Sequence, residues 1–381
     1  MIVTLAQKKI RFMCTLTFFF ENIDNYDSES YNVKKRNRFH IKVKMKNINI
    51  KSIAQEAGVS RTTVSRVLNN SGYVNIETKK KVDQVIKKYG YTPSAFARYL
   101  HKGHSDIIGV LIPEIENPFF GEILKVISRE AENHSLSMIC FNSNNDGNKD
   151  IHALVTMKNY RIKGLIYTPA VDYQTEKERQ RISNLLNDIA APVILLDRKM
   201  DYYKNADGVF FDNFSAAYQA TKALIEAGHT NIAIINAELN RVLARERQAG
   251  YLKALAEFSL KTKDDYIFLG DYTVETSYEL AKKCLTLKDR PTAVLTCNNF
   301  TSLGFMKAAN ELGIHLKEDI VCVGFDRLNE LEIMGIPFNY IERNTQEMAD
   351  KAVDFLIKRL AAPERPYSQH VIMPKLVLRN M

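Results

Sequence analysis

Residues 53–69 read IAQEAGVSRTTVSRVLN, and this stretch decides how the chain is organised. Two apolar sets recur in it at helical spacing: Ile53, Ala54 and Ala57, then Val64, Val67 and Leu68. Gly58 separates the two sets and is expected to break the first helix. Ser60 stands where the second helix needs an N-cap, because its hydroxyl can accept a hydrogen bond from a free backbone N–H. The stretch therefore predicts two short helices joined by a tight turn.

A third helix is expected to close this small domain. Asn75 can cap its start, and Gly90 can end it. Its apolar face would be formed by Val82, Val85, Ile86 and Tyr89. Two short helices joined by a glycine-containing turn, with a third packed on them, make a helix-turn-helix domain, which we place at residues 46–92.

The second helix carries polar side chains away from its apolar face: Arg61, Thr62, Thr63, Ser65 and Arg66. In this motif the recognition helix presents its N-terminal residues to base edges in the major groove of DNA. Arginine can donate two hydrogen bonds to guanine, and threonine can offer a hydroxyl or pack its methyl group on thymine. The lysines of the third helix are expected to face phosphates or solvent: Lys79, Lys80, Lys81, Lys87 and Lys88.

The net charge of +9 is unevenly distributed along the chain. Residues 45–103 carry 11 Lys and Arg against 3 Asp and Glu, residues 1–44 carry 9 against 4, and residues 104–381 carry 33 against 37. A short basic segment joined to a mildly acidic body indicates that one part of the chain meets a polyanion. A three-helix protein-interaction module is the alternative, and the surplus of positive charge disfavours it.

The first 44 residues lack the periodicity of either a helix or a strand. The run Phe12–Phe20 follows basic residues, as in a secretory signal, but acidic residues come directly after it and no small-residue cleavage site is present. We expect residues 1–45 to form a disordered extension, and translation of the native protein to begin at Met45.

Residues 93–103 are expected to act as a hinge between the first domain and the rest of the chain. Pro93 can open a helix, because the N–H that it lacks would be unpaired there. Residues 95–100 could then form little more than one helical turn, which is too short to be stable alone. We expect this segment to become ordered when two copies pair on DNA. The alternative is an ordinary linker in which Leu100 is a packing residue.

Residues 104–381 alternate short apolar strands with amphipathic helices. The expected strands are Ile107–Ile112, Ser137–Phe141, Gly164–Tyr167, Val193–Leu196, Gly208–Phe211, Ile232–Ile235, Ala293–Thr296 and Ile320–Gly324. Helices are expected between them, as at Glu122–Ala131, Ala216–Ala227, Glu275–Cys284 and Ser302–Leu312. The alternation predicts an α/β architecture with right-handed crossovers, and its length fits two doubly wound parallel-sheet lobes.

Ligands of doubly wound folds sit beyond the carboxyl ends of the strands. Several expected strands are followed there by a polar or aromatic residue, namely Asn117, Phe119, Asp197, Asn298 and Asp326. A single residue of this kind is more often an ordinary loop or cap residue. Recurrence at equivalent ends of successive strands predicts a small-molecule site.

Other functional classes lack the residues that they need. The five cysteines are scattered without a C-x-x-C pair and the histidines lack metal-ligand spacing, so we expect no disulfide framework, metal site or cofactor. No phosphate loop, dinucleotide fingerprint or convincing Ser/His/Asp set is present, so the chain is not expected to be an enzyme. No apolar run approaches the ~20 residues that span a bilayer.

Residues 53–69 resemble the headpiece of the LacI (lactose/purine repressor) family, and the body up to Arg379 is similar to that family's effector domain, which is related in fold to periplasmic sugar-binding proteins. The resemblance implies that Arg61, Thr62 and Arg66 read DNA bases. The further DNA contacts that it implies are Ser60, Thr63, Ser65 and Asn69 in the headpiece, and Ala97 and Leu100 in the hinge. The hinge leucine of the family wedges into a minor-groove step and kinks the duplex.

The same resemblance implies an effector site made of Phe119, Asp197, Arg247, Tyr272, Asn298, Asp326 and Arg343. Its polar members could grip ligand hydroxyls, and its aromatic members could stack on the apolar face of a sugar ring. Two positions depart from the family. Asn299 replaces a common Asp, and Arg343 stands where Gln is frequent, which leaves open a phosphorylated or acidic effector beside a neutral sugar.

The expected function is that of a cytoplasmic repressor of a carbohydrate-utilisation operon, of the sucrose- or ribose-operon repressor type. It would bind a palindromic operator in double-stranded DNA as a homodimer, and a sugar or sugar phosphate would modulate its affinity. Two alternatives stay open. One is a global regulator of carbon metabolism controlled by a partner protein. The other is a transport-associated sugar-binding protein. Such a protein would carry an export signal and lack a headpiece, whereas this sequence has the headpiece pattern and no convincing export signal.

Overall fold

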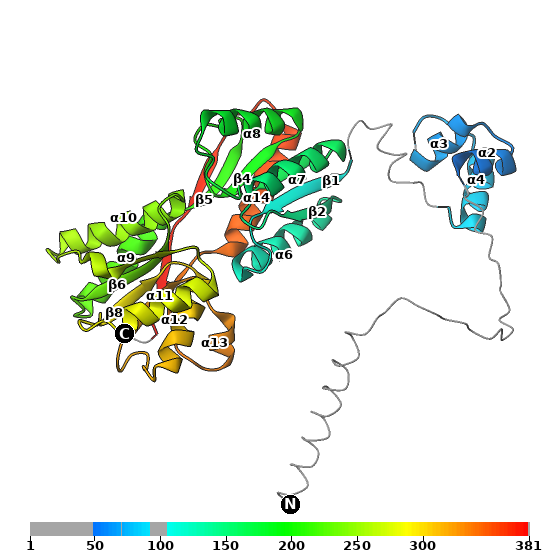
Figure 1. The fold of residues 1–381 in the computed structure, drawn as a ribbon. Helices are drawn as coiled ribbons and strands as arrows, with labels where there is room; N and C mark the ends of the chain where they lie inside the picture. The colour runs from blue at the N-terminus through cyan, green and yellow to red at the C-terminus, as the bar shows by residue number, and fades with distance from the viewer. Residues whose placement is uncertain (1–48, 70, 92–104, 380–381) are drawn as a thin grey trace, which may run out of the picture. The chain divides into compact units, whose positions relative to one another are not determined.

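The computed structural model describes residues 49–69, 71–91 and 105–379 (Figure 1). The expected extension at residues 1–45 and the hinge at residues 93–103, with Ala97 and Leu100, lie outside the described residues. The chain divides into two units, with the boundary between Thr92 and Pro93. The described residues of the first unit form three helices, and those of the second form the α/β body.

The first unit has the three helices that its sequence predicts: α2 (Ile50–Ala57), α3 (Arg61–Asn69) and α4 (Ile76–Tyr89). Asn49 caps α2, and Gly58 ends it in the left-handed conformation that glycine adopts without strain. Asn75 caps α4, and Gly90 ends it in the same way as Gly58 ends α2. The helices bury one small apolar core formed by Ile53, Ala54, Val64, Val67 and Val82.

The second unit contains two lobes, each built on a six-stranded sheet of described residues. The N-lobe sheet is parallel and has the strand order β11-β5-β4-β3-β1-β2. Its strands are β1 (Ile107–Ile112), β2 (Ser137–Asn142), β3 (Gly164–Tyr167), β4 (Val193–Asp197), β5 (Asp207–Phe211) and β11 (Gln369–Ile372). Its helices are α6 (Pro118–Asn133), α7 (Gly147–Asn159), α8 (Glu176–Asp188) and α14 (Thr345–Ala361). Helices α6 and α14 pack on one face of this sheet, and α7 and α8 pack on the other.

The C-lobe repeats this plan with the strand order β12-β10-β9-β8-β6-β7. Its strands are β6 (Ile232–Ala237), β7 (Ile267–Gly270), β8 (Ala293–Thr296), β9 (Val321–Phe325), β10 (Asn339–Glu342) and the antiparallel β12 (Lys375–Val377). Its helices are α9 (Asn213–Glu226), α10 (Val242–Glu257), α11 (Val274–Leu285), α12 (Asn299–Glu311) and α13 (Asn329–Ile333), with a 3-10 turn at Asp264–Tyr266. The two doubly wound lobes confirm the expected fold class.

The chain passes between the lobes at three places: after β5, between β10 and α14, and between β11 and β12. Two of these connections place polar residues at the lobe boundary, and of these only Arg343 was an expected site residue. Asn213 begins α9 directly after the first connection, and Arg343 lies within the second. No helix of the described residues is both long and apolar enough to cross a membrane.

Several helices begin earlier than their apolar pattern predicts, because a polar residue caps them upstream. Helix α6 begins at Pro118 rather than Glu122, since the side chain of Asn117 accepts a hydrogen bond from Phe119 N at 3.1 Å. Helix α9 begins at Asn213 rather than Ala216, since Asp212 accepts from Ser215 N at 2.8 Å. An apolar stripe marks the buried face of a helix but not its first turn.

We predict that Gly250→Ala destabilises the C-lobe, because α9 and α10 approach each other most closely at this glycine. A Cβ at position 250 would lie 2.2 Å from the backbone oxygen of Phe214, so the two helices would have to separate. Overpacking of this kind costs roughly 1–3 kcal/mol of unfolding free energy, which chemical denaturation measures. Gly121→Ala in α6 is the control, because a Cβ there meets no atom within 4 Å. It should stabilise the protein slightly, and an equal loss in both variants would refute the close-approach explanation.

Candidate functional site

Ser60 and Thr63 start the recognition helix α3. Ser60 Oγ accepts a hydrogen bond from Thr63 N at 3.1 Å and lies 2.8 Å from the hydroxyls of both Thr62 and Thr63. This N-cap bond satisfies one of the free N–H groups of the first turn. The polar residues at the start of α3 therefore have a structural role besides the DNA contact that the resemblance implies.

The outward face of α3 carries the three expected base-reading residues. Arg61, Thr62 and Arg66 are exposed, whereas Val64 and Val67 are buried against the other helices. Thr63 and Ser65 are half-buried beside the core. The fold thus separates the side chains that hold the helix from those that can reach a groove.

The surface of the first unit is mainly basic. Lys51 and most lysines of α4 are exposed, and Lys88 forms an ion pair with Glu56 at 2.6 Å. This pair joins α4 to α2, so Lys88 has a partner other than phosphate. The remaining positive charge suits a polyanionic partner.

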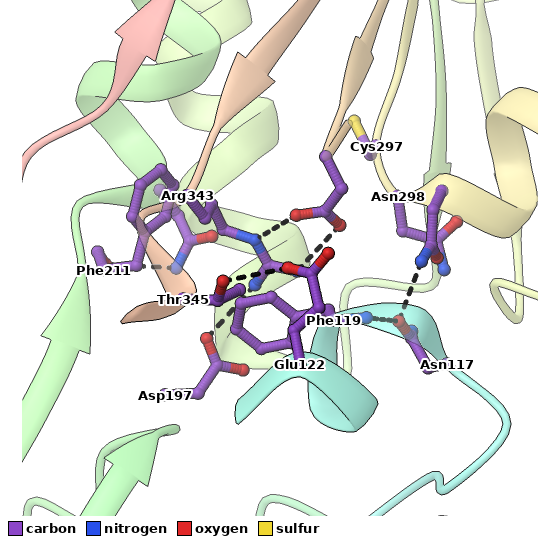
Figure 2. Close-up of polar contacts among 12 residues, drawn as sticks. Asn117, Phe119, Glu122, Asp197, Phe211, Cys297, Asn298, Arg343 and Thr345 are labelled. Carbon is purple, nitrogen blue, oxygen red and sulfur yellow. Dashed lines mark hydrogen bonds and ion pairs between the residues drawn. The ribbon is translucent and has the colours of Figure 1, made fainter. Parts of the chain in front are cut away.

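Three expected cleft residues of the second unit form one buried ion-pair cluster at the lobe boundary (Figure 2). Arg343 donates to both carboxylate oxygens of Asp326, from Nε at 2.6 Å and from Nη2 at 2.8 Å. Its Nη1 donates to Oδ1 of Asp197 at 3.2 Å. Burial alone would lower the pKa of Arg343, but Asp326 and Asp197 outweigh it, and the pKa lies above its usual value. The cluster contains two carboxylates and one cation.

The aromatic ring of Phe119 lies against the guanidinium of this cluster (Figure 2). The Cζ atom of Arg343 lies 3.5 Å from the ring centroid of Phe119 and 5.8 Å from that of Phe211. A cation over an aromatic face is attracted by the ring quadrupole. Phe119 therefore contacts Arg343 where a sugar ring was expected.

Arg247, another expected site residue, lies in the C-lobe among groups of which only Tyr272 was expected. Arg247 Nε donates to Oδ1 of Asn213 at 2.9 Å, and its Nη1 donates to the backbone oxygen of Cys297. The guanidinium also lies 4.1 Å from the ring centroid of Phe325 and 5.8 Å from that of Tyr272. The charge of this arginine meets neutral groups rather than a carboxylate.

Asn298 and Tyr272 are engaged with each other and with the backbone. Asn298 caps α12 by accepting from Thr301 N at 2.7 Å, and its Nδ2 donates to the backbone oxygen of Tyr272 at 3.2 Å. The Tyr272 hydroxyl donates to Oδ1 of Asn236 at 2.6 Å. A ligand hydroxyl would have to share or replace these bonds.

Three of the expected residues have left-handed backbone conformations. The φ angles are 63° at Asp197, 73° at Asp326 and 72° at Tyr272. Such conformations are costly for residues other than glycine, most of all for a bulky side chain, and they gather at functional sites. Their recurrence at strand ends supports a binding role for the cleft.

Further contacts in the cleft involve residues outside the effector site that the resemblance implies. Asn299 Nδ2 donates to Oδ1 of Asn117 at 2.8 Å across the lobes, and Asp172 accepts from the backbone N of Val242, which begins α10. Glu122 on α6 accepts from Thr345 at 2.9 Å and from Asn329 at 3.3 Å. The positions of Asn117 and Asn299 after strands were sequence signals for these two residues. Asp172 and Glu122 had none, because their contacts depend on how the lobes meet.

The open space around this cluster is divided into small cavities. One cavity of about 220 Å³ is lined by residues that include Phe119, Asp326 and Arg343. Another of about 160 Å³ is lined by Asp172, Arg198, Arg241 and neighbouring residues. A space of only about 20 Å³ lies beside Asp197 and Glu246. Burial raises the pKa of Glu246, although a hydrogen bond from Asn213 and nearby cations oppose it. No cluster of His, Cys, Asp and Glu in the described residues could hold a metal ion.

Comparison with known proteins identifies the same two parts. Residues 49–94 match the family of bacterial regulatory proteins of the lacI type, and residues 105–375 match the family described as periplasmic binding proteins and sugar binding domain of the LacI family. The HTH-type transcriptional repressor PurR of Mannheimia succiniciproducens is 31% identical over 332 residues, which cover 87% of this chain and 97% of the relative. PurR of Pasteurella multocida is 32% identical over 331 residues, with the same coverage.

Solved structures show the same architecture. The lac repressor dimer bound to operator and the anti-inducer ONPF matches with a TM-score of 0.74 and 25% identity, covering 87% of this chain and 98% of that one. The complex of the transcriptional regulator CelR with cellobiose matches with a TM-score of 0.64 and 21% identity, covering 87% and 99%, and supports the fold alone. The headpiece match distinguishes the chain from a binding protein of transport systems, and neither match is to an enzyme. The chain belongs to the LacI family and is a DNA-binding transcriptional repressor with an effector-binding domain.

Proposed function

We propose that this repressor controls a carbohydrate-utilisation operon and that a neutral sugar in the interlobe cleft modulates its operator affinity. The observation that carries the proposal is the charge balance of the cleft centre, where one arginine faces two carboxylates. Carboxylate and amide groups around it, from Asp197, Asp326 and Asn298, are suited to accept hydrogen bonds from sugar hydroxyls. Phe119 also lines the cavity of about 220 Å³ beside Arg343 and offers an apolar wall to a sugar there.

This charge balance bears on the choice between a neutral sugar and a sugar phosphate. Arg343 was the residue that left a phosphorylated effector open, but both of its guanidinium edges are engaged by Asp197 and Asp326. A phosphate placed here would meet a cluster with an excess of negative charge, and like charges repel strongly in a buried site. We therefore favour the neutral sugar.

Calorimetric titration of the full chain with matched pairs of sugars and their phosphates tests the effector class. Sucrose and ribose are the first ligands to try, because repressors of those operons are the candidate subtypes. We expect a neutral sugar to bind at least about tenfold more tightly than its phosphate, which corresponds to about 1.4 kcal/mol. Tighter binding of the phosphate would overturn the neutral-sugar assignment.

We further propose that the chain acts as a homodimer on a palindromic operator. The segment that ends α13 exposes Ile333 at 85%, Met334 at 62% and Ile336 at 42% of their surfaces. Adjacent exposed apolar side chains of this size mark interaction surfaces. A second copy is the occupant that we assign, because paired headpieces double the number of bases that are read. Sedimentation equilibrium should show a dimer, and a monomer at micromolar concentration would refute it.

The DNA contacts implied by the resemblance enter this proposal as a set. In the headpiece they are Ser60, Arg61, Thr62, Thr63, Ser65, Arg66 and Asn69, and in the hinge they are Ala97 and Leu100. The corresponding division is a headpiece at residues 46–92, a hinge at 93–103 and an effector and dimerisation domain at 104–381. Control by a partner protein instead of a small molecule is the rival within the same class, and the titration above also tests it.

A further inference from the structure

Arg343 connects the two lobes through buried charged groups. It lies between β10 of the C-lobe and α14 of the N-lobe, and its bidentate partner Asp326 follows β9 of the C-lobe. Its other partner, Asp197, ends β4 of the N-lobe. The three side chains are only 5–8% exposed. One guanidinium therefore joins a carboxylate from each lobe away from solvent.

The guanidinium also fills the space between these carboxylates. Phe119, on the N-lobe helix α6, lies 3.5 Å below it, and the cavity lined by Phe119 and Asp326 lies on one side of it. On the side of Asp197 the remaining space is about 20 Å³, too small for a sugar. The chain's own side chain thus occupies the position between two hydrogen-bond acceptors where a ligand is expected.

Without this cation the cluster would be unfavourable. Two carboxylates that face each other in a buried site repel, and one of them must protonate or become hydrated. Separation of the lobes would hydrate both carboxylates. The other contacts across the cleft are neutral or more exposed. Asn117–Asn299 is a neutral pair, and the partners of Glu122 are neutral groups. Asp172 accepts from Val242 N and pairs with Arg245 at 3.9 Å, but the side chain of Arg245 is 48% exposed.

We propose that Arg343 is an interlobe latch that holds the cleft closed in the effector-free protein. The latch takes the place of the ligand that would otherwise bridge the two lobes. An effector then acts on a cleft that is already closed, and it must share or displace the bonds of Asp197 and Asp326. This last step rests on the proposed function, whereas the latch itself requires neither effector nor DNA.

The test measures the distance between the lobes in the ligand-free full chain by pulsed electron spin resonance. Spin labels are placed at Lys177→Cys on α8 of the N-lobe and Lys283→Cys on α11 of the C-lobe, both exposed positions. Cys14 and Cys140 are replaced by serine, and the labelled chain is diluted into unlabelled chain so that distances within one chain dominate. The variants are Arg343→Gln and, as the control, Arg327→Gln. Arg327 pairs with Glu332 within the C-lobe, and its only influence from the described residues of the N-lobe is a longer-range attraction to Glu122.

The latch predicts one short distance between the two spin labels in the wild type. The same distance is expected in the control Arg327→Gln, which keeps Arg343. Arg343→Gln should add a longer distance, with the ratio of open to closed chains raised by about tenfold or more. If Arg343→Gln does not fold, Asp197→Gly decides. It removes the N-lobe acceptor, leaves the bidentate pair intact, and suits the left-handed backbone at this position. A wild-type distribution in the deciding variant, or equal opening in Arg327→Gln, overturns the latch. Such a failure leaves the sugar titration unaffected, so the two proposals can fail separately.

Discussion

Arg61→Ala is expected to weaken operator binding by roughly 2–6 kcal/mol, about 30-fold or more in the dissociation constant. The side chain is exposed at the start of α3, and a dimer would lose its base contact in both half-sites. A good bidentate pair with guanine contributes about 1–3 kcal/mol to discrimination. The loss should therefore be concentrated at one base pair of each half-site, which binding assays on a set of singly substituted operators would show.

Lys87→Ala is the matched control for this prediction. Lys87 is an exposed cation on α4, away from the recognition helix. Removal of a phosphate contact weakens binding to all DNA sequences alike, and it reduces the slope of the salt dependence by about one unit. If Arg61→Ala behaved in this uniform way, Arg61 would be a phosphate contact and the base-reading assignment would be wrong.

The second large effect is expected for Asp207→Asn, which should lower the free energy of unfolding by about 3–5 kcal/mol. Asp207 is almost completely buried at the start of β5. It accepts from Arg359 at 3.0 and 3.2 Å, from Arg365 at 2.8 Å and from Ser368 N at 2.8 Å. Asparagine keeps the shape but removes the charge, so it leaves two arginines without their counter-ion in a largely buried site.

Asp354→Asn tests whether this loss belongs to burial rather than to any ion pair of the N-lobe. Asp354 pairs with Lys358 at 2.8 Å on α14, but both side chains are exposed. Exposed pairs of this kind contribute only about 0.5 kcal/mol, because water and salt screen them. Denaturant unfolding should give a much larger loss of unfolding free energy for Asp207→Asn than for Asp354→Asn. Equal losses would contradict the claim that burial makes the Asp207 ion pairs important.

Local sequence signals were sufficient for the headpiece and for most of the body. Ser60, Asn75 and Gly90 act as caps and stops through bonds to near neighbours, so their roles can be predicted from spacing alone. The same holds for the central strands, which are continuous apolar runs. Strands β7, β11 and β12 were not predicted, because they are short, partly exposed edge strands without a clear apolar run. Strand β10, which is largely buried, was also missed.

The cleft shows where sequence reasoning reaches its limit. Positions after strands drew attention to Asp197 and Asp326, and the structure brings both into contact with Arg343. That Arg343 would pair with both could not be predicted, because Asp197 is 146 residues away and the contact exists only when the lobes meet. An arginine where the family often has Gln indicates an unusual charge in the cleft. From the sequence this charge suggests contact with an acidic ligand, whereas in the structure it meets carboxylates of the protein itself.

The most direct test of the central claim is fluorescence anisotropy of the full chain on a palindromic duplex, selected from a random pool, with and without a sugar that it binds. The account predicts at least about 10³-fold preference for this duplex over random DNA. It also predicts a change of about 5- to 150-fold in operator affinity when the sugar is added. Equal binding to palindromic and random DNA, or an operator affinity that no bound sugar changes, would contradict it.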